Sequence, residues 1–416
     1  MSPGGSPVAP SSTLWNWSFT IWLIGTAQSQ LGHALAGIAL SFLVLHQTGS
    51  AGQMALTLAC SLVPNLLMPL AGAWIDRVNL KIPLIGADIV RGLLQLTVGG
   101  LALWWGEVPL WLVNAAAFLS GLAGIFAGPA TNVALPMLVP EAELPRANGI
   151  LGGLSQSAYL LGTLGGGLIV SAFSPAAAIM ADGFGFLIMA SLLLFVQLPG
   201  RNALPTGQRP GIWADLRSGL KLMSRSRLLT FIPLLALLIN ITTGPVMVVT
   251  PKLMESLGYG AKGYGVFLAL ESVGLLVAGA IFGVLGKRIP LRLCALLGFL
   301  LLSASLLGMW LLPTYTPLIA FSFGVGLSIG LLNTPIMTLL QQNVPGEYLG
   351  RVFSVLSASA SLGMPLTLLI VAPFVDHLPL NLWFGLNAAV MLLGAVIWAG
   401  VILIEREVPD LKESQV

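Results

Sequence analysis

Gly72-Ala73-Trp74-Ile75-Asp76-Arg77-Val78-Asn79-Leu80-Lys81 is the stretch that decides how this chain folds. It is a short charged turn between two apolar runs, residues 52–75 and 83–105. A helix that crosses a bilayer needs about 20 consecutive apolar residues, and both runs are long enough. The turn therefore joins two predicted membrane-spanning helices.

The composition explains why a charged turn stands out. Hydrophobic residues make up 56% of the 416 residues, charged residues only 8%, and the mean hydropathy is +0.93. Soluble domains carry roughly 25% charged residues. Because hydrocarbon offers the backbone no hydrogen-bond partners, only helices and closed barrels span membranes. The alternating pattern of a barrel is not seen, so we expect an all-α integral membrane protein.

Twelve apolar runs qualify as transmembrane helices. They cover residues 15–45, 52–75, 83–105, 109–136, 147–173, 176–198, 228–251, 263–286, 291–312, 317–341, 351–374 and 380–404. The first thirteen residues contain no Lys or Arg, unlike the positively charged start of a signal peptide. We therefore expect the first run to remain as a span.

The basic residues predict the orientation, since Lys and Arg are retained on the cytoplasmic side. With both termini cytoplasmic, fifteen of the 18 basic residues fall in cytoplasmic segments, and only Lys252 and Lys262 fall in outer loops. They are scattered over six loops, so we expect no nucleic-acid partner. Cys60 and Cys294 both fall within spans and suggest no disulfide.

The chain divides in the middle at one long basic connection with six spans on each side. The predicted parts are an N-terminal segment 1–14, a first bundle 15–198, a cytoplasmic linker 199–227, a second bundle 228–404 and a cytoplasmic tail 405–416.

The two halves share loop sequences. Val139-Pro140-Glu141-Ala142-Glu143-Leu144-Pro145-Arg146 and Val344-Pro345-Gly346-Glu347-Tyr348-Leu349-Gly350-Arg351 match at Val, Pro, Leu and Arg with one offset, 344 minus 139, or 205 residues. Gly283 to Arg288 follows the eighth span as Gly72 to Arg77 follows the second. Many secondary transporters are built from such repeats. We therefore predict two pseudo-symmetric six-helix bundles.

The pattern Gly72-x3-Asp76-Arg77-x3-Lys81 resembles the signature loop of the major facilitator superfamily. Further motifs resemble its macrolide-efflux and enterobactin-exporter branch: Thr48-Gly49-Ser50, Asp88-Ile89-Val90-Arg91, Ala147-Asn148-Gly149, Asp182-Gly183-Phe184-Gly185-Phe186, and Gln341-Gln342-Asn343-Val344-Pro345 with Leu349-Gly350-Arg351. The resemblance implies two bundles rocking about a central cavity, proton-coupled export of a small molecule, and a monomer in the lipid of the plasma (inner) membrane.

The signature loop is also a predicted gate. Gly72 allows close helix approach, and Asp76 suits the positive N-terminal end of a helix from the other half. A plain positive-inside loop would explain Arg77 but not Asp76. Leu80 stands where the family loop usually has a basic residue. The residues expected in the cytoplasmic charge network and its loops are Arg77, Lys81, Asp88, Arg91, Arg146 and Arg351.

The fifth span carries a glycine run that resembles the antiporter motif of the superfamily. Gly162-Thr163-Leu164-Gly165-Gly166-Gly167 has Thr163 where a proline is typical. Small residues also permit plain close packing of helices, and this alternative carries equal weight for Gly162, Gly166 and Gly167.

Ionisable residues inside spans are candidates for proton coupling, because burying charge in hydrocarbon costs about 2.5–3.5 kcal/mol or more. His33, Asp182 and Glu271 qualify, with Glu271 the leading candidate. Asp182 is equally explained as a hydrogen bond between helices, and His33 as a packing residue. His33 replaces the acid that relatives show, although imidazole still titrates near neutral pH.

Polar residues in the spans expected to line the cavity are few, which favours an amphipathic or lipophilic substrate over a sugar. These candidates are Gln28, Ser29, Gln156, Asn240, Thr243 and Asn333.

Other functional classes lack their signatures. No phosphate-binding Gly-x4-Gly-Lys-Ser/Thr string occurs, so an ATP-driven pump is not expected. Three histidines, at 33, 46 and 377, are too scattered for a metal site or an enzyme active site. We therefore expect no enzyme and no cofactor, with the proton gradient as energy source. A lysophospholipid translocator or an importer of the same fold stays open, as does a non-transporting sensor.

The gate hypothesis makes a prediction at Asp76. If its carboxylate latches the inner gate, Asp76→Asn lowers transport, because the amide loses the charge that a helix N-terminus attracts. Membrane insertion stays intact, which a membrane-fraction immunoblot checks. Full transport activity of this variant would refute the role.

Overall fold

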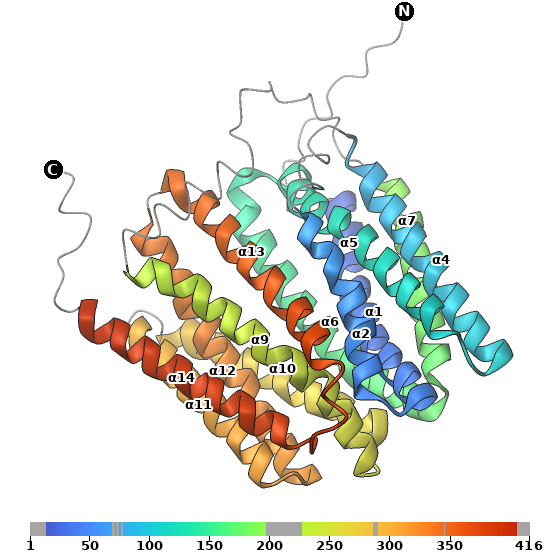
Figure 1. The fold of residues 1–416 in the computed structure, drawn as a ribbon. Coiled ribbons are helices and arrows are strands. Elements are labelled where there is room, and N and C mark those ends of the chain that lie inside the picture. The colour runs from blue at the N-terminus through green and yellow to red at the C-terminus, as the bar shows by residue number, and fades with distance from the viewer. Residues whose placement is uncertain are drawn as a thin grey trace, which may run out of the picture. The chain divides into compact units, whose positions relative to one another are not determined.

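The computed structural model describes residues 14–68, 71, 75, 78–196, 227–285, 290–344 and 346–405. Most of these residues are helical, and they include no strand (Figure 1). The helices of the first half are α1 (Trp17–Thr48), α2 (Ala51–Leu62), η1 (Val63–Leu67), α4 (Lys81–Trp105), α5 (Leu110–Leu138), η2 (Glu141–Glu143), α6 (Leu144–Ala172) and α7 (Pro175–Phe195). Those of the second half are α9 (Arg227–Ser256), α10 (Gly260–Leu285), α11 (Leu291–Leu311), α12 (Tyr315–Asn343), α13 (Gly346–Val371) and α14 (Leu382–Glu405).

The predicted spans coincide with these helices. Each of the twelve apolar runs falls on one long helix, when α2 and η1 are counted together. Among the described residues, nine helices are long and apolar enough to cross a membrane, and Ala51–Leu67 and Ser361–Val371 are shorter apolar helices. The all-α membrane fold predicted from hydropathy is confirmed.

The sequence predicted one continuous helix over residues 52–75 for the second span. The structure shows an interruption in this helix. It narrows to a 3₁₀ helix at Val63–Leu67, with Pro64 in its first turn. Proline has no N–H to donate, and its ring clashes with the carbonyl four residues earlier. The proline therefore interrupts the α-helix, and Met68, Ala71 and Ile75 beyond it are again α-helical. The structure describes only residues 71 and 75 between Met68 and Val78.

Local sequence fixes where the helices begin and end. The Asn16 side chain accepts from the Phe19 N–H at 2.9 Å and donates to the Leu138 carbonyl of α5 at 2.8 Å. Gly49 ends α1 with φ 64°, a left-handed conformation that glycine adopts without strain. Ser174 caps α7 through the Ala177 N–H at 3.1 Å.

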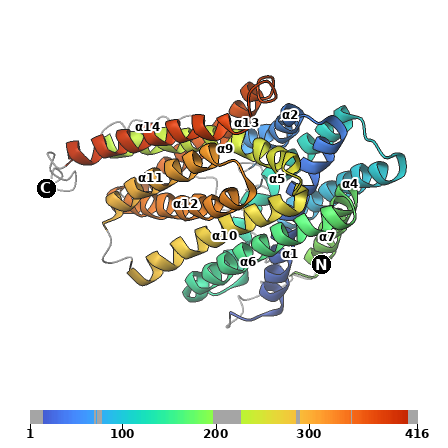
Figure 2. The same ribbon diagram turned by 90° about the horizontal axis from the view of Figure 1, so that it is seen from below.

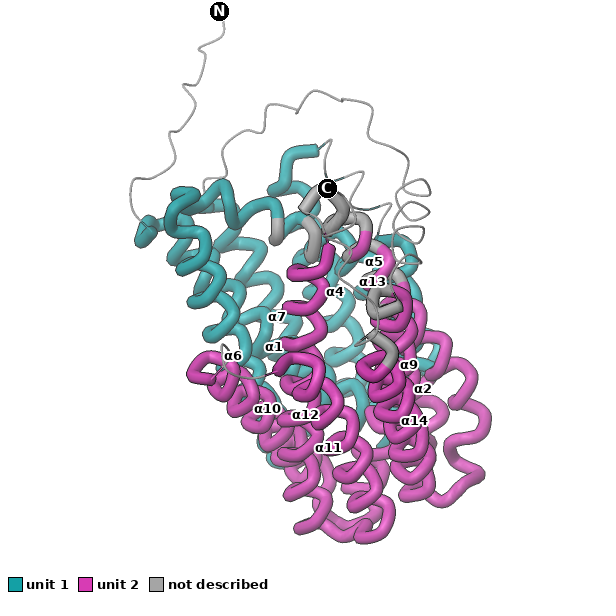
Figure 3. The backbone as a smooth tube through the Cα atoms, turned by 90° about the vertical axis from the view of Figure 1, so that its left-hand side faces the viewer, with its two compact units in different colours: residues 1–49, 56–209 teal, residues 50–55, 210–416 magenta. Residues whose placement is uncertain are grey.

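The molecule consists of two compact units (Figure 3). Unit 1 comprises residues 1–49 and 56–209, and unit 2 comprises residues 50–55 and 210–416. Most of the predicted linker, residues 199–226, lies outside the described part of the chain. The short segment Ser50–Ala55 belongs to unit 2, although the sequence places it in the first half.

The helix packing within each unit repeats. In unit 1, α1 packs against α6 and α7, while α4 packs against α5 and α7. The counterparts in unit 2 do the same, since α9 packs against α13 and α14, while α11 packs against α12 and α14. Figure 2 shows α11 and α12 side by side. The repeated pairing supports the internal duplication predicted from the loops.

Proline recurs inside the helices of unit 2. Pro233, Pro245 and Pro251 lie within α9, Pro335 within α12 and Pro365 within α13. Each removes one backbone hydrogen bond, which neighbouring helices make tolerable in a membrane.

The glycine run of α6 is a helix-packing surface. Gly162 and Gly166 are four residues apart and are buried against α1. A Cβ at Gly162 would lie 2.5 Å from the Leu31 carbonyl oxygen, and one at Gly166 would lie 3.0 Å from the Leu35 Cα. Gly167 is also buried. The residues of the antiporter-like motif therefore bring two helix backbones together.

This packing predicts different effects for two neighbouring glycines. Gly162→Ala destabilises the protein by about 1–3 kcal/mol, because the added methyl group forces α6 away from α1. Gly165→Ala has no such effect, since nothing lies within 4 Å of the Cβ position there. Thermal unfolding of the purified variants in detergent measures the difference. Equal melting temperatures would contradict this account of the motif.

Candidate functional site

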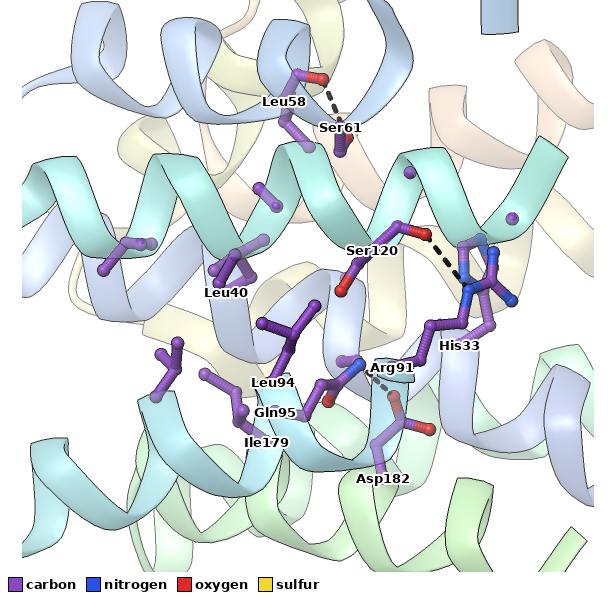
Figure 4. A pocket seen from close by; sticks show the side chains of 18 of the residues that line it. His33, Leu40, Leu58, Ser61, Arg91, Leu94, Gln95, Ser120, Ile179 and Asp182 are labelled. Carbon is purple, nitrogen blue, oxygen red and sulfur yellow. Dashed lines mark hydrogen bonds between the residues drawn. The ribbon is translucent and has the colours of Figure 1, made fainter. Parts of the chain in front are cut away.

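A cavity of about 400 Å³ lies inside unit 1, between α1, α2, α4, α5 and α7 (Figure 4). Most of its wall is apolar, including Leu40, Leu58, Leu94 and Ile179. One part is polar, and the side chains there are His33, Ser61, Asn65, Arg91, Gln95, Ser120 and Asp182. Ionisable side chains at membrane depth are costly and mark functional sites. This cavity is the candidate site that the described residues form.

Asp182 of α7 is the acid at the polar end. It is only 3% exposed, and its Oδ2 accepts a hydrogen bond from Gln95 Nε2 at 2.7 Å. A Cβ at Gly32 of α1 would overlap the Asp182 carboxylate. The glycine therefore leaves the space that the acid occupies, and α4 and α1 together fix the carboxylate.

Arg91 of α4 is the positively charged residue of the same polar cluster. Its Nε donates to the Ser120 carbonyl of α5 at 3.2 Å, and its guanidinium carbon lies 5.4 Å from the centre of the Phe186 ring. A stacked arginine gains a cation–π interaction, which strengthens where water is excluded. A Cβ at Gly124 of α5 would overlap the guanidinium. Glycine thus makes room for both charged groups.

Electrostatic interactions join four ionisable groups here. Arg91 interacts with Asp88 and with Asp182, and also with His33, which extends toward it in Figure 4. No carboxylate of the described residues lies within ion-pair distance of Arg91. Two acids face one arginine, so the group carries one excess negative charge when both acids are ionised. A proton or a cation bound there would neutralise it.

Gln95 is a site residue that the sequence prediction missed. Its Nε2 holds Asp182, while its Oε1 is buried without a hydrogen-bond partner. An unsatisfied buried acceptor costs about 1–3 kcal/mol. The signal in the sequence was the spacing, since Gln95 follows Arg91 by four residues and so shares its helix face. Only the structure shows that this face meets α7.

The predicted gate is partly visible. Gly72, Asp76 and Arg77 lie outside the described residues. Lys81 Nζ donates to the Leu194 carbonyl at 3.2 Å, near the C-terminal end of α7. A cation is favoured at this end by the helix dipole. Lys81 therefore stabilises a helix end within unit 1.

Arg91 was expected to join Asp88 and Lys81 in a network at the cytoplasmic edge, and the structure places it away from Lys81. It lies ten residues beyond Lys81 on α4, which is about 15 Å along the helix axis. Its side chain lines the cavity instead. Asp88 is buried, one helical turn before Arg91.

Arg146, the arginine of the first repeated loop, does not line the cavity. Arg146 is exposed and lies 3.6 Å from Glu143, a pair of the kind that contributes little in water. Arg351 lies on α13, and its side chain is not among those described.

The remaining candidates do not line the cavity of unit 1. Glu271 lies on α10, and the described residues offer its side chain no hydrogen bond or ion pair. The Gln28 amide packs against Gly185 of α7. Asn240 and Thr243 each donate to a carbonyl of their own helix at 2.8 Å. Ser29 and Gln156 are half-buried, and Asn333 is exposed.

The described residues contain no group of three or more His, Cys, Asp or Glu side chains placed to hold a metal ion. The residues of the site form a charge cluster beside an apolar cavity. Such a site can bind a proton or an amphipathic molecule.

Comparison with known proteins decides the family. The model of the Major Facilitator Superfamily matches residues 22–267 and 232–415. The chain belongs to the Major Facilitator Superfamily. It is therefore a multi-pass membrane transporter and not an enzyme.

Two groups of relatives align over nearly the whole transporter. Macrolide efflux protein A of Streptococcus pyogenes is 27% identical over 402 residues, covering 92% of this chain and 96% of that protein. The multidrug efflux pump Tap of Mycobacterium tuberculosis is 27% identical over 405 residues, covering 94% and 93%. The resemblance to macrolide exporters is confirmed.

Solved structures share the fold. The nucleoside transporter NupG matches with a TM-score of 0.78 at 8% identity, covering 93% of this transporter and 100% of that chain. A bacterial homologue of the iron transporter ferroportin, in an inward-facing state, matches with a TM-score of 0.71 at 17% identity, covering 92% and 98%.

The charge cluster predicts that Arg91 and Asp182 are coupled. Arg91→Met and Asp182→Asn each destabilise the transporter, because each leaves an opposite charge or a polar group uncompensated. The double variant loses less than the sum, with a coupling free energy of about 0.5–3 kcal/mol. A double-mutant cycle on thermal or denaturant unfolding in detergent measures it. Strict additivity would show that the two side chains act independently.

Proposed function

We propose that this transporter exports amphipathic small molecules by alternating access and that the proton gradient drives it. The observation that carries the direction and the substrate class is the alignment with macrolide efflux protein A over 92% of the chain and with the multidrug efflux pump Tap over 94%. We further propose that it acts as a monomer in the lipid of the plasma membrane with both termini cytoplasmic.

The cavity of unit 1 supports the substrate class. Its wall is mainly leucine, valine, alanine and isoleucine, with one polar end. Small-molecule sites are typically apolar with a few placed polar groups, and their volumes run from about 300 to 1,000 Å³. A molecule with an apolar body and one polar group fits such a wall better than a sugar does.

The charge cluster supports proton coupling. Asp88, Arg91 and Asp182 lie within a spanning helix pair, where an uncompensated negative charge is expensive. Taking up a proton removes the excess charge, and releasing it restores the charge. Glu271 offers a second acid in unit 2, without a polar partner among the described residues. These two places are the proposed proton sites, with His33 beside the first.

Transport in inside-out membrane vesicles tests the function. With the imposed gradient acid inside, a labelled macrolide accumulates in vesicles that contain the transporter, because export from the cell is uptake into an everted vesicle. Collapsing the gradient with an uncoupler abolishes the accumulation. Substrate loss from the vesicles would instead show an importer, and movement of lysophospholipid but not of macrolides would show a lipid translocator. Ligand binding without any flux would show a sensor.

Glu271→Gln separates the two proton sites. The amide cannot release a proton, so gradient-driven export is lost, whereas exchange of labelled for unlabelled substrate across the membrane persists. Glu107→Gln is the matched control, since Glu107 is exposed in the loop after α4. Both rates are measured in the same vesicles at several pH values.

Retained gradient-driven export in Glu271→Gln would point to the charge cluster of unit 1 as the proton site. If pH-driven flux of Glu271→Gln equals that of the unchanged protein, Glu271 is ruled out as the coupling acid. Asp182→Asn then becomes the variant that loses gradient response while keeping exchange. Retained coupling in both variants would rule out both acids.

A further inference from the structure

Asp376 lies in a tight loop after α13 and was not singled out by the sequence. The Phe374 N–H donates to the Val371 carbonyl at 2.9 Å, and the His377 N–H donates to the Phe374 carbonyl at 3.0 Å. These turns fix the loop backbone on both sides of the acid. Its carboxylate therefore has a defined direction.

The carboxylate caps the first turn of α2. The Ala51 N–H donates to Oδ1 at 3.0 Å, the Gly52 N–H donates to Oδ2 at 3.0 Å, and the Ser50 hydroxyl donates to Oδ2 at 2.5 Å. The Ser50 oxygen in turn accepts from the Gln53 N–H at 3.1 Å. A helix leaves its first four N–H groups without internal partners. Here a residue far away in sequence satisfies two of them.

Lys252 completes the cluster. Its Nζ lies 2.5 Å from Asp376 Oδ1, and the two side chains are 25% and 27% exposed. The carboxylate thus meets an ammonium group and the positive end of a helix dipole, both of which favour its charged form. All the residues of this Asp376 cluster, Ser50, Ala51, Gly52, Lys252 and Asp376, belong to unit 2.

The cluster persists over the physiological pH range. Partial burial acts to raise the pKa of Asp376, but hydrogen bonds from Lys252, Ser50, Gly52 and Ala51 outweigh it and lower the pKa to about 2. Because the folded pKa lies below the ordinary value of 3.8, the stabilisation is complete above about pH 4 and is lost only as pH falls toward 2. Ordinary pH changes leave this acid ionised.

The backbone of α2 also lies in close contact with the loop after α13. A Cβ at Gly52 would overlap the Ala372 carbonyl oxygen. Only glycine allows this approach, so the first turn of α2 is held by shape as well as by charge.

Helix α2 is continuous from Ala51 to Leu62, but its residues divide between the units. Ser50–Ala55 belong to unit 2, and the residues from Leu56 onward belong to unit 1. The break at Pro64 comes later, within unit 1. Under the proposed alternating access, motion of one unit against the other bends α2 or releases its first turn.

We propose that Asp376 is a positioning residue for transport, which holds the first turn of α2 in one state of the cycle and releases it in another. The inference rests on the proposed alternating access and not on the proposed substrate or coupling ion. The hold is made of hydrogen bonds, two of them partly buried, and one partly exposed ion pair.

Hydrogen–deuterium exchange of residues 51–55, together with transport, tests the proposal. Asp376→Ala raises exchange of this segment about 2- to 30-fold, the equivalent of losing a helix N-cap, and lowers the maximal transport rate. The substrate concentration at half-maximal rate changes little, because the cluster touches no cavity residue. Asp376→Glu keeps the acceptor oxygens and retains most of both properties. Glu107→Ala is the exposed control.

Two further variants separate the cap from the ion pair. Lys252→Met removes the ammonium but keeps the helix cap, so its effect is smaller than that of Asp376→Ala. The exchanged pair Lys252→Asp with Asp376→Lys restores nothing, because a lysine cannot accept from the α2 N–H groups. Restoration by the exchanged pair would overturn the capping role.

Folding failure and loss of function are distinguishable. Thermal unfolding of each purified variant reports whether the protein still folds, and exchange in residues 260–285 of α10 serves as an internal reference. A folded Asp376→Ala protein with unchanged exchange at 51–55 and unchanged transport would overturn the proposal. If the unchanged protein transports no macrolide while Asp376→Ala still raises exchange at 51–55, the hold stands and the proposed substrate is refuted.

Discussion

Every backbone N–H and C=O group within hydrocarbon must find a partner inside the protein, and the rest of this structure follows from that requirement. Each apolar run therefore forms a helix. Side chains are needed as hydrogen-bond partners where a helix ends or is interrupted. Asn16 and Ser174 satisfy helix starts locally. Lys81 meets a carbonyl near the end of α7, and Asp376 meets the start of α2. Charged residues are scarce in this chain, and several of them serve such ends.

The architecture was predictable because it depends on hydropathy alone. The twelve apolar runs, their approximate bounds and the duplication of the halves all appear in the sequence, and the helix pairing of the two units repeats as the duplication requires. The interruption of the second span was not predicted, although Pro64 lies within its apolar run. Its effect on a helix depends on position within the turn, and the apolar pattern runs straight through it.

The site was predictable as a set of unusual residues but not as an arrangement. Asp182 and His33 stood out as ionisable groups in apolar runs, whereas the sequence placed Arg91 in a network with the cytoplasmic loop. Helix rotation decides which residues face one another, and it is set by close contacts such as those at Gly32 and Gly124. Gln95 and Asp376 are ordinary polar residues in sequence, and only their partners make them distinctive. Pairing between distant helices leaves no local trace.

The three prolines of α9 have a mechanical consequence. Pro233, Pro245 and Pro251 each delete one hydrogen bond from the ladder that stiffens a helix, and the last stands next to Lys252. Each missing bond lowers the stiffness of the helix at that point, so α9 bends more readily there than a helix with an unbroken hydrogen-bond ladder.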